Sequence, residues 1–246
     1  MARVDIIASV FNADEFLEGY FNDLVGQTFF KESRLILVAP NPSQKLINLS
    51  KSVGEIYGNV DLIKLEIDRG VSNCLNIALK SSSSEYVTIA NTDDRKRPDS
   101  LFRHFIELES NPEIDLVYAP SLVSTSPNET FYVNSCKSIH PCLEFEGLQG
   151  LLKNNSPHNN PMWRRSIHKK NGYLDESLIS AADGELWMRC VLNGSKFKMI
   201  KDVLGMYYLN PKGMSTNQDH IQERVEEVLA VRRKYANLLH EQNKAL

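Results

Sequence analysis

The first 119 residues alternate short apolar runs with amphipathic stretches, and this alternation limits the fold more than any other feature. Short continuous apolar runs are typical of buried strands, whereas apolar residues repeated at helical spacing indicate helices. The expected strands cover residues 4–10, 35–39, 60–67, 86–90 and 114–119. The expected helices cover residues 14–25, 43–57, 71–80 and 99–110. The pattern predicts an α/β fold with a mostly parallel sheet and helices on both faces.

Polar residues follow several of these strands directly. The stretches concerned are Phe11-Asn12, Pro40-Asn41, Asp68 and Asn91 to Asp94. In a sheet of this kind, ligands bind beyond the carboxyl ends of the strands. Asp93 stands next to Asp94, and two like charges side by side are unfavourable unless water, a cation or a ligand relieves them. A solvated turn is the alternative interpretation, but the place of the pair at this edge favours a binding site.

The second half of the chain is more polar and less regular. The expected strands cover residues 131–134, 159–163, 197–200 and 204–209. The expected helices cover residues 143–153, 183–193 and 218–242. We expect one domain over residues 1–246, with a sheet-bearing half at about 1–119, a smaller mixed region at about 120–216 and a C-terminal helix at about 217–246. That helix is expected to pack on the domain, and a partner-binding or oligomer-forming role is the alternative.

Composition excludes several classes of protein. The net charge is −3 and the basic residues are dispersed, which argues against a nucleic-acid partner. The apolar runs are far too short to span a bilayer, and the first residues show no signal-peptide pattern. We therefore expect a cytoplasmic protein without a transmembrane segment. The cysteines form no C-x-x-C pair and have no histidine at zinc-ligand spacing, so free thiols are expected.

Another stretch with chemical potential begins at residue 172. It reads GYLDESLISAADGELWMRC and places Asp183 at the start of an expected helix. As a structural residue, Asp183 would be an N-cap, accepting a backbone N–H and stabilised by the helix dipole. As a functional residue, it would present a carboxylate at the edge of the fold. The two interpretations do not exclude each other.

Five stretches of the chain, taken together, resemble a known family. They are ASVFN at 8–12, GVSNCLNIA at 70–78, SEYVTIANTDD at 84–94, NGYLDE at 171–176 and ADGELWMR at 182–189. Their order and spacing over about residues 3–215 resemble those of the family 2 inverting glycosyltransferases. That family has the GT-A fold, a Rossmann-like arrangement that binds nucleotide-diphosphate sugars. Each stretch alone is a weak signal, and the series of five indicates both fold and class.

The resemblance implies roles for the acidic residues. Asp93 would contact a Mn²⁺ or Mg²⁺ ion that also binds the two phosphates of the donor, because a hard cation neutralises the charge on the leaving group. Asp183 matches the base that takes the proton from the attacking hydroxyl on the opposite face of the sugar. Asp94 would fix the loop or meet the acceptor.

The same resemblance implies the remaining contacts. The residues on the nucleotide-sugar side would be Val10, Asn12, Asn41, Arg69, Asn91, Thr92 and Asp93. The residues on the acceptor side would be Asp94, His158 and Asn159. Lys212 falls in the family's mobile loop, where it could supply positive charge to the diphosphate.

The chain departs from the family pattern at three positions. Asn41 stands where the family usually has the acid that reads a uracil N–H, although an amide oxygen can accept the same hydrogen bond. Asn91 replaces the first acid of the D-x-D motif, and Ala182 replaces the acid before the base. These changes put the metal affinity and the identity of the base in doubt.

The resulting expectation is an inverting glycosyltransferase that moves a sugar from a nucleotide-diphosphate donor, UDP-sugar first, to a glycan or other hydroxyl acceptor. Polysaccharide or glycoconjugate synthesis would be its setting. One alternative is a nucleotide-sugar-binding module with weakened catalysis. Another is a sugar-phosphate nucleotidyltransferase, which usually carries a Gly-rich, basic first loop. Residues 10–14 read VFNAD at that place, which argues against it.

Overall fold

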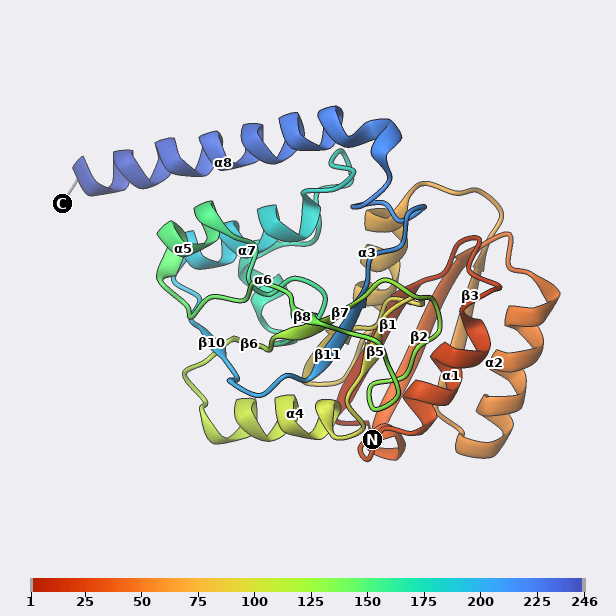
Figure 1. Cartoon of the computed structure of the whole chain (residues 1–246). Coiled ribbons are helices and arrows are strands. Elements are labelled where there is room, and N and C mark those ends of the chain that lie inside the picture. Colours follow the sequence, from red (N-terminus) through yellow and green to blue (C-terminus); the bar gives the residue numbers. More distant parts are fainter. Residues whose placement is uncertain (1, 245–246) are drawn as a thin grey trace.

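A seven-stranded sheet in the order β10–β6–β9–β4–β1–β2–β3 runs through the molecule (Figure 1). We describe it from a computed structural model, which covers residues 2–244. The strands are β1 (Val4–Ser9), β2 (Ser33–Pro40), β3 (Val60–Leu65), β4 (Tyr86–Ile89), β6 (Leu116–Tyr118), β9 (Pro161–Arg164) and β10 (Phe197–Met199). Neighbouring strands are parallel except where β9 pairs with β4 and with β6. The mostly parallel α/β sheet that the alternation predicts is confirmed.

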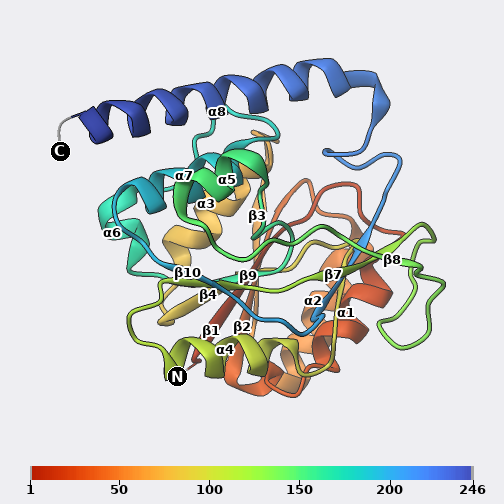
Figure 2. The ribbon, with the colours of Figure 1, turned by 60° about the vertical axis from the view of Figure 1, so that its left-hand side comes forward.

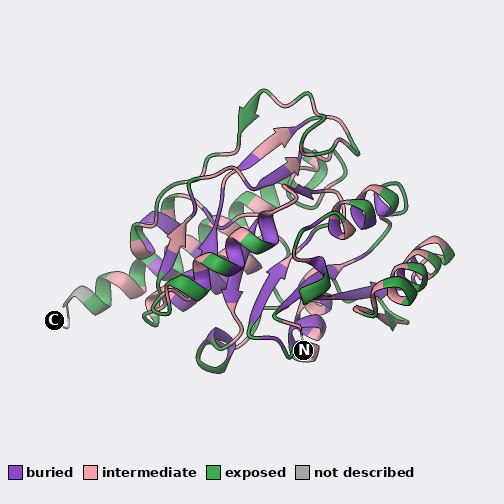
Figure 3. Cartoon of the chain, turned by 90° about the horizontal axis from the view of Figure 1, so that it is seen from below, coloured by how far each residue is buried: buried purple, intermediate pink, exposed green. Residues whose placement is uncertain are grey.

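The continuous apolar runs arise because both faces of this sheet are covered. Successive side chains of a strand point to opposite faces. Ile6 and Leu37 therefore belong to one core, whereas Ile7 and Ile36 belong to a second core on the other face. Helices α1, α2 and α4 pack on the first core, and α3, α5, α6, α7 and α8 on the second, so that the two groups lie on opposite sides of the sheet (Figure 2). The strands are mostly buried, and the outer surfaces of the helices are exposed (Figure 3).

The helices of the first half lie where the apolar spacing predicts them. They are α1 (Leu17–Val25), α2 (Gln44–Tyr57), α3 (Val71–Ser81) and α4 (Ser100–Ser110), with a short 3₁₀ turn, η1 (Phe30–Glu32). Ser43 caps α2, since its hydroxyl oxygen accepts the backbone N–H of Leu46 at 3.1 Å. Helix α1 begins at Leu17, later than the expected residue 14. The residues before it form a turn, in which the backbone N–H of Phe16 donates to the carbonyl of Ala13.

A second sheet has four strands in the order β5–β11–β7–β8, three of which come from the expected smaller mixed region. Its strands are β5 (Arg95–Lys96), β11 (Gly205–Tyr208), β7 (Ser121–Ser124) and β8 (Ser138–Ile139). The helices of the second half are α5 (Gly147–Lys153), α6 (Ile167–Asn171) and α7 (Ala182–Leu192). Strands β9 and β10 also come from the second half but complete the large sheet. The two halves of the chain therefore share one sheet.

The expected strand at residues 131–134 is wrong. The stretch forms bends instead, and Tyr132 and Val133 are exposed. The Thr130 hydroxyl accepts the backbone N–H of Val133, and the Asn134 amide donates to the carbonyls of Thr130 and Phe131. Such local side-chain bonds compete with an extended backbone. No apolar face is buried here that would offset their loss.

The C-terminal segment forms a 3₁₀ turn, η2 (Gln218–His220), and the long helix α8 (Ile221–Lys244), which lies over α5 and α7 (Figures 1 and 2). Val231 and Tyr235 are buried in the second core. The Tyr235 hydroxyl donates to Glu185 of α7 at 2.6 Å. The expectation of a packed terminal helix is confirmed. Within residues 2–244, no helix is both long and apolar enough to cross a membrane.

The cysteines are free, as expected from their spacing. Cys74 of α3 and Cys190 of α7 are buried in the second core. Burial raises the pKa of the Cys190 thiol to about 12, so that it stays protonated at neutral pH. Both thiols act as small apolar core groups.

Candidate functional site

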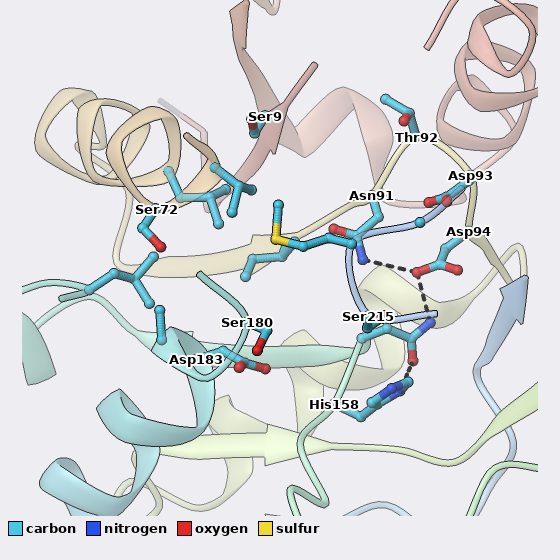
Figure 4. Close-up of a pocket in the computed structure, with 18 of the residues that line it drawn as sticks. Ser9, Ser72, Asn91, Thr92, Asp93, Asp94, His158, Ser180, Asp183 and Ser215 are labelled. Carbon is cyan, nitrogen blue, oxygen red and sulfur yellow. Dashed lines mark hydrogen bonds between the residues drawn. The ribbon is translucent and has the colours of Figure 1, made fainter. Parts of the chain in front are cut away.

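A hollow of about 300 Å³ lies at the carboxyl ends of β1 and β4, where Ser9 and Ile89 line it. It brings together many residues that the sequence assigns to one site. Those residues are Asn91, Thr92, Asp93, Asp94, His158, Asn159 and Asp183. They come from the loop after β4, the loop before β9 and the first turn of α7. Asp93 and Asp183 lie on opposite sides of the hollow (Figure 4).

The adjacent acids Asp93 and Asp94 have different surroundings. Asp94 is buried, and its carboxylate accepts the Asn91 amide at 3.0 Å (Figure 4). It also accepts the Asn159 amide at 3.1 Å and the Tyr208 backbone N–H at 3.1 Å. Asp93 is partly exposed, and one of its oxygens accepts the Asn210 amide at 3.0 Å. Asp94 is thus fixed in the loop, and Asp93 has a carboxylate edge open to a ligand.

The carboxyl of Asp94 is costly to ionise. Burial is the main cause, and repulsion from Asp93 adds to it, so that its pKa is raised to about 7. The hydrogen bonds from Asn91 and Asn159 act in the opposite direction. The loop therefore contains Asp94, which is only partly ionised at neutral pH, next to Asp93, whose carboxylate faces the hollow.

The basic residues that follow the acid pair donate hydrogen bonds that stabilise the loop. Arg95 is buried and donates to the carbonyls of Thr92 and Asp94 at 2.9 and 2.7 Å. Lys96 is also buried and donates to the Asn160 side chain at 2.7 Å. Burial lowers the pKa of Lys96 to about 8. These charges brace the loop and do not line the hollow.

Asp183 lies in the first turn of α7, and its interpretation as an N-cap is wrong. The N-cap residue is Ala181, which makes no side-chain cap. The Asp183 carboxylate accepts the Gly184 backbone N–H at 2.7 Å and the Asn155 amide at 2.8 Å. Burial raises the pKa of Asp183 above its ordinary value, while both hydrogen bonds lower it. The result is a carboxylate with a fixed orientation on the rim of the hollow.

His158 and Asn159 lie in the loop before β9, where Asn159 donates to Asp94 at 3.1 Å. The His158 ring stacks on His140 with ring centroids 3.9 Å apart and meets Tyr207 edge-on at 4.6 Å. Its backbone has a φ of 40°, which is uncommon for a residue other than glycine. Burial lowers the pKa of His158 to about 4, so the ring is neutral at neutral pH. The stack presents a rigid aromatic edge next to Asp94.

A second hollow, of about 310 Å³, lies at the carboxyl ends of β1 and β2. Val10, Asn12 and Asn41 line it together. The backbones of Asn12 and Asn41 have φ values of 48° and 44°, a conformation that asparagine tolerates better than most side chains. Consecutive residues at the end of β1 line the two hollows, since Ser9 lines the first and Val10 lines the second.

Two of the expected contacts are not brought to these hollows. Arg69 and Lys212 are exposed, and neither lines the first or the second hollow. Arg69 lies on the loop between β3 and α3, where Val71 instead faces the first hollow. A donor-binding role for Arg69 and Lys212 therefore rests on the family resemblance alone.

Two residues of the site escape a search of the sequence. Asn155 bonds Asp183, and Asn210 bonds Asp93. Both are asparagines in polar loops without any motif, so no pattern distinguishes them from ordinary turn residues. Only the fold brings them to the acids.

The residues around Asp93 fit a divalent cation in one particular way. The described residues 2–244 contain no group of three or more His, Cys, Asp or Glu side chains that could hold a metal ion. Mg²⁺ and similar cations often bind through one or two carboxylates together with substrate phosphates. The single open carboxylate of Asp93 suits that mode and does not suit a cage made by the protein alone.

Comparisons with known proteins bear on the family and the fold of this chain. The family model described as glycosyl transferase family 2 matches residues 5–172. An uncharacterised glycosyltransferase of Methanocaldococcus jannaschii is 25% identical over 241 residues, covering 91% of this chain and 74% of the relative.

Solved structures share the fold. Staphylococcus aureus TarS in complex with UDP superposes with a TM-score of 0.72 at 19% identity, covering 96% of this chain and 65% of that one. The mannosyltransferase PcManGT of Pyrobaculum calidifontis, in complex with GDP-Man and Mn²⁺, superposes with a TM-score of 0.69 at 14% identity, covering 93% and 63%. This chain therefore spans less than two thirds of either structure, and the likeness confirms the GT-A fold. Since the family model matches more than half of its residues, the chain belongs to glycosyl transferase family 2.

Proposed function

We propose that this chain is an inverting glycosyltransferase that moves a sugar from a nucleotide-diphosphate donor to a hydroxyl acceptor. One observation supports this most. The carboxylates of Asp93 and Asp183 line one hollow from opposite sides (Figure 4). A displacement with inversion needs an acid-assisted or metal-assisted leaving group on one face of the sugar and a base on the other.

Asp183 acts as the general base in this proposal. Burial raises its pKa, which makes it a stronger base than an exposed aspartate. The acceptor oxygen attacks the anomeric carbon, and its proton passes to the Asp183 carboxylate. The bond from that carbon to the diphosphate oxygen breaks, and the nucleoside diphosphate leaves with the bonding electrons. Attack from the face opposite the leaving group inverts the configuration.

Asp93 holds the leaving-group side. Its open carboxylate would bind Mn²⁺ or Mg²⁺ together with the donor phosphates, and Asn210 orients that carboxylate through its amide. When bound, the cation neutralises the negative charge that gathers on the departing diphosphate. Asn91 adds no charge to this site, because a carboxamide is neutral, and its amide N–H is used to fix Asp94.

The donor nucleotide is proposed to occupy the second hollow, with UDP as the first choice. Asn12 and Asn41 supply amide groups there, and the Asn41 oxygen could accept a uracil N–H. Among the structural neighbours, TarS is described with UDP and with UDP-GlcNAc, and PcManGT with GDP-Man and Mn²⁺. A thermal-shift screen across UDP, GDP, CDP and dTDP, each with and without Mn²⁺, selects the nucleotide.

The acceptor is proposed to enter beside His158 and Asn159, and to be a glycan or another hydroxyl compound in polysaccharide or glycoconjugate synthesis. The stacked rings of His140 and His158, with Tyr207 at their edge, form a surface suited to a sugar ring. Asp94 fixes this side through its bond to Asn159.

Two matched variants test the proposal on the nucleotide that the screen selects. Asp183→Asn should bind that nucleotide as the parent does and should lower turnover ~100-fold or more, as loss of a general base does. Asp93→Ala should lose the Mn²⁺-dependent part of binding, measured by calorimetry. A parent that binds equally with and without Mn²⁺ would exclude Asp93 as a metal ligand. Full turnover in Asp183→Asn would exclude Asp183 as the base.

A nucleotide-sugar-binding module without turnover is the second candidate. It is favoured by Asn91 and Ala182, which leave one open carboxylate in the D-x-D position and no acid before Asp183. Both candidates predict donor binding. Donor consumption with a mixture of glycan acceptors separates them, since only the transferase releases nucleoside diphosphate.

A further inference from the structure

The first hollow has an aliphatic wall on the side of α3. Val71 and Leu75, one helical turn apart on α3, line it together with Ile89 of β4 and Leu186 of α7. The hydroxyls of Ser72 and Ser180 line the same part (Figure 4). The proposed chemistry uses the carboxylates on either side of the hollow and does not use this wall.

The wall is exposed where the fold would normally bury it. Strand β4 lies in the middle of the seven-stranded sheet, and the side chain of Ile7 on the adjacent β1 is fully buried. Ile89, at the end of β4, is nevertheless partly exposed, as are Val71 and Leu75. Since all three line the hollow, the exposed part faces it. Aliphatic surface in a concave site gains free energy when an apolar group covers it, at roughly 25 cal/mol per Å².

An ordinary hexose would not suit this wall. Each hydroxyl pressed against Leu75 or Ile89 would lose its hydrogen bonds to water without replacement. An acylamino substituent would suit it, because its methyl group can cover the aliphatic side chains. Its N–H and C=O can then meet the hydroxyls of Ser72 and Ser180, which can both donate and accept. These hydroxyls make only long contacts of 3.5 Å within the chain, to the Leu178 carbonyl and the Glu227 carboxylate, which a ligand group can replace.

We infer that the transferred sugar carries an acylamino group, and that this group enters the hollow between α3 and β4 against Val71, Leu75 and Ile89. The inference rests on the proposed function, because it takes the hollow as the place of the donor sugar. It makes Leu75 a residue that selects the sugar and does not take part in the chemistry.

Donor pairs that differ only in this substituent test the inference. On the diphosphate selected by the screen, N-acetylglucosamine and glucose donors are compared by calorimetry with Mn²⁺, with a 6-deoxyhexose donor as a third arm. We expect the acylamino donor to bind about 10-fold more tightly or better than the glucose donor, which is the range of apolar pocket contacts. Equal affinities for these two overturn the inference while leaving the proposed function intact. A preference for the deoxy sugar over both also overturns it.

A substitution in the wall provides the second readout. Leu75→Phe adds bulk to the hollow and should weaken binding of the acylamino donor about 10-fold, with the free diphosphate bound as in the parent. Ile56→Phe is the matched control, because Ile56 is 74% exposed on α2 and lines neither hollow. An unchanged sugar preference in folded Leu75→Phe counts against the inference. If no nucleotide or donor binds the parent at all, the proposed function fails as well.

Discussion

At the scale of single residues, the site depends on the different surroundings of two neighbouring carboxylates, Asp93 and Asp94. Asp94 accepts three hydrogen bonds and is buried, whereas Asp93 keeps an open edge. The sequence predicts that this pair faces a binding edge, because the strand before it is plainly apolar. The apolar pattern alone does not say which acid is open, and only the family resemblance pointed to Asp93. The physical reason is the pair of contacts from Asn159 and Tyr208 to Asp94, which come from distant parts of the chain. The same limit applies to Asn155 beside Asp183.

Asn155 offers a test of how Asp183 is tuned. Its amide donates to the Asp183 carboxylate, which favours the ionised form and lowers the pKa. Without that bond in Asn155→Leu, the pKa of Asp183 should rise further. A base works only when deprotonated, so the acidic limb of kcat/KM against pH should move to higher pH by the same amount. The rate on the alkaline plateau should stay close to that of the parent.

The pH profile separates positioning from simple damage to the fold. Asn155→Asp should move the limb further, because a second negative charge disfavours ionisation of Asp183. Asn154→Leu is the control, since the Asn154 amide bonds the carbonyl of Pro141 and not Asp183. A loss of rate that is equal at every pH in Asn155→Leu would contradict the assignment.

At the scale of elements, helix α8 is tied to the start of α7. The Glu227 carboxylate of α8 accepts the backbone N–H groups of Ile179, Ser180 and Ala181 at 2.7 to 3.1 Å. A negative charge at this end of α7 is also favoured by the helix dipole. Helix α7 has no side-chain cap from its own N-terminal residues. Glu227, from a distant part of the chain, takes the place of that cap. It thereby holds the turn that carries Asp183.

Glu227→Gln should weaken that hold without removing the side chain. We expect the free energy of unfolding to fall by about 1 kcal/mol. We expect turnover to fall roughly 10-fold, because a small misplacement of a catalytic group is costly. Nucleotide affinity should stay unchanged. Glu226→Gln is the matched control, as Glu226 is exposed and bonds Gln222 on its own helix. Parental turnover in Glu227→Gln would show that α8 has no part in placing Asp183.

Elements with regular apolar spacing could be predicted, and short polar ones could not. The strands of the first half are read directly from their buried runs, and α8 from its repeated apolar residues. Strands β5 and β8 have two residues each and carry no apolar pattern. They form because β11 and β7 offer them edges. Pairing partners of this kind are set by the whole fold, which no local window of sequence contains.

At the scale of the whole molecule, the site joins the two halves of the chain. Asp93 comes from the first half and Asp183 from the second, while β9 and β10 of the second half lie in the large sheet. We therefore expect a division near residue 119 to mark a change of character and not a boundary between folding units. The shared sheet explains how two carboxylates so far apart in the sequence can keep a fixed relation.

One cooperative unfolding transition should follow from this shared sheet. Trp163 of β9 and Trp187 of α7 lie in the second core with ring centroids 5.2 Å apart, so their fluorescence reports that core. Far-ultraviolet circular dichroism reports all helices. We expect the two urea curves to coincide, as in two-state unfolding, and to move together when nucleotide and Mn²⁺ are added. At a ligand concentration ~100 times Kd the shift should correspond to about 2.7 kcal/mol. A tryptophan transition that precedes the dichroism curve, or a ligand shift confined to one probe, would show two units and contradict a single domain.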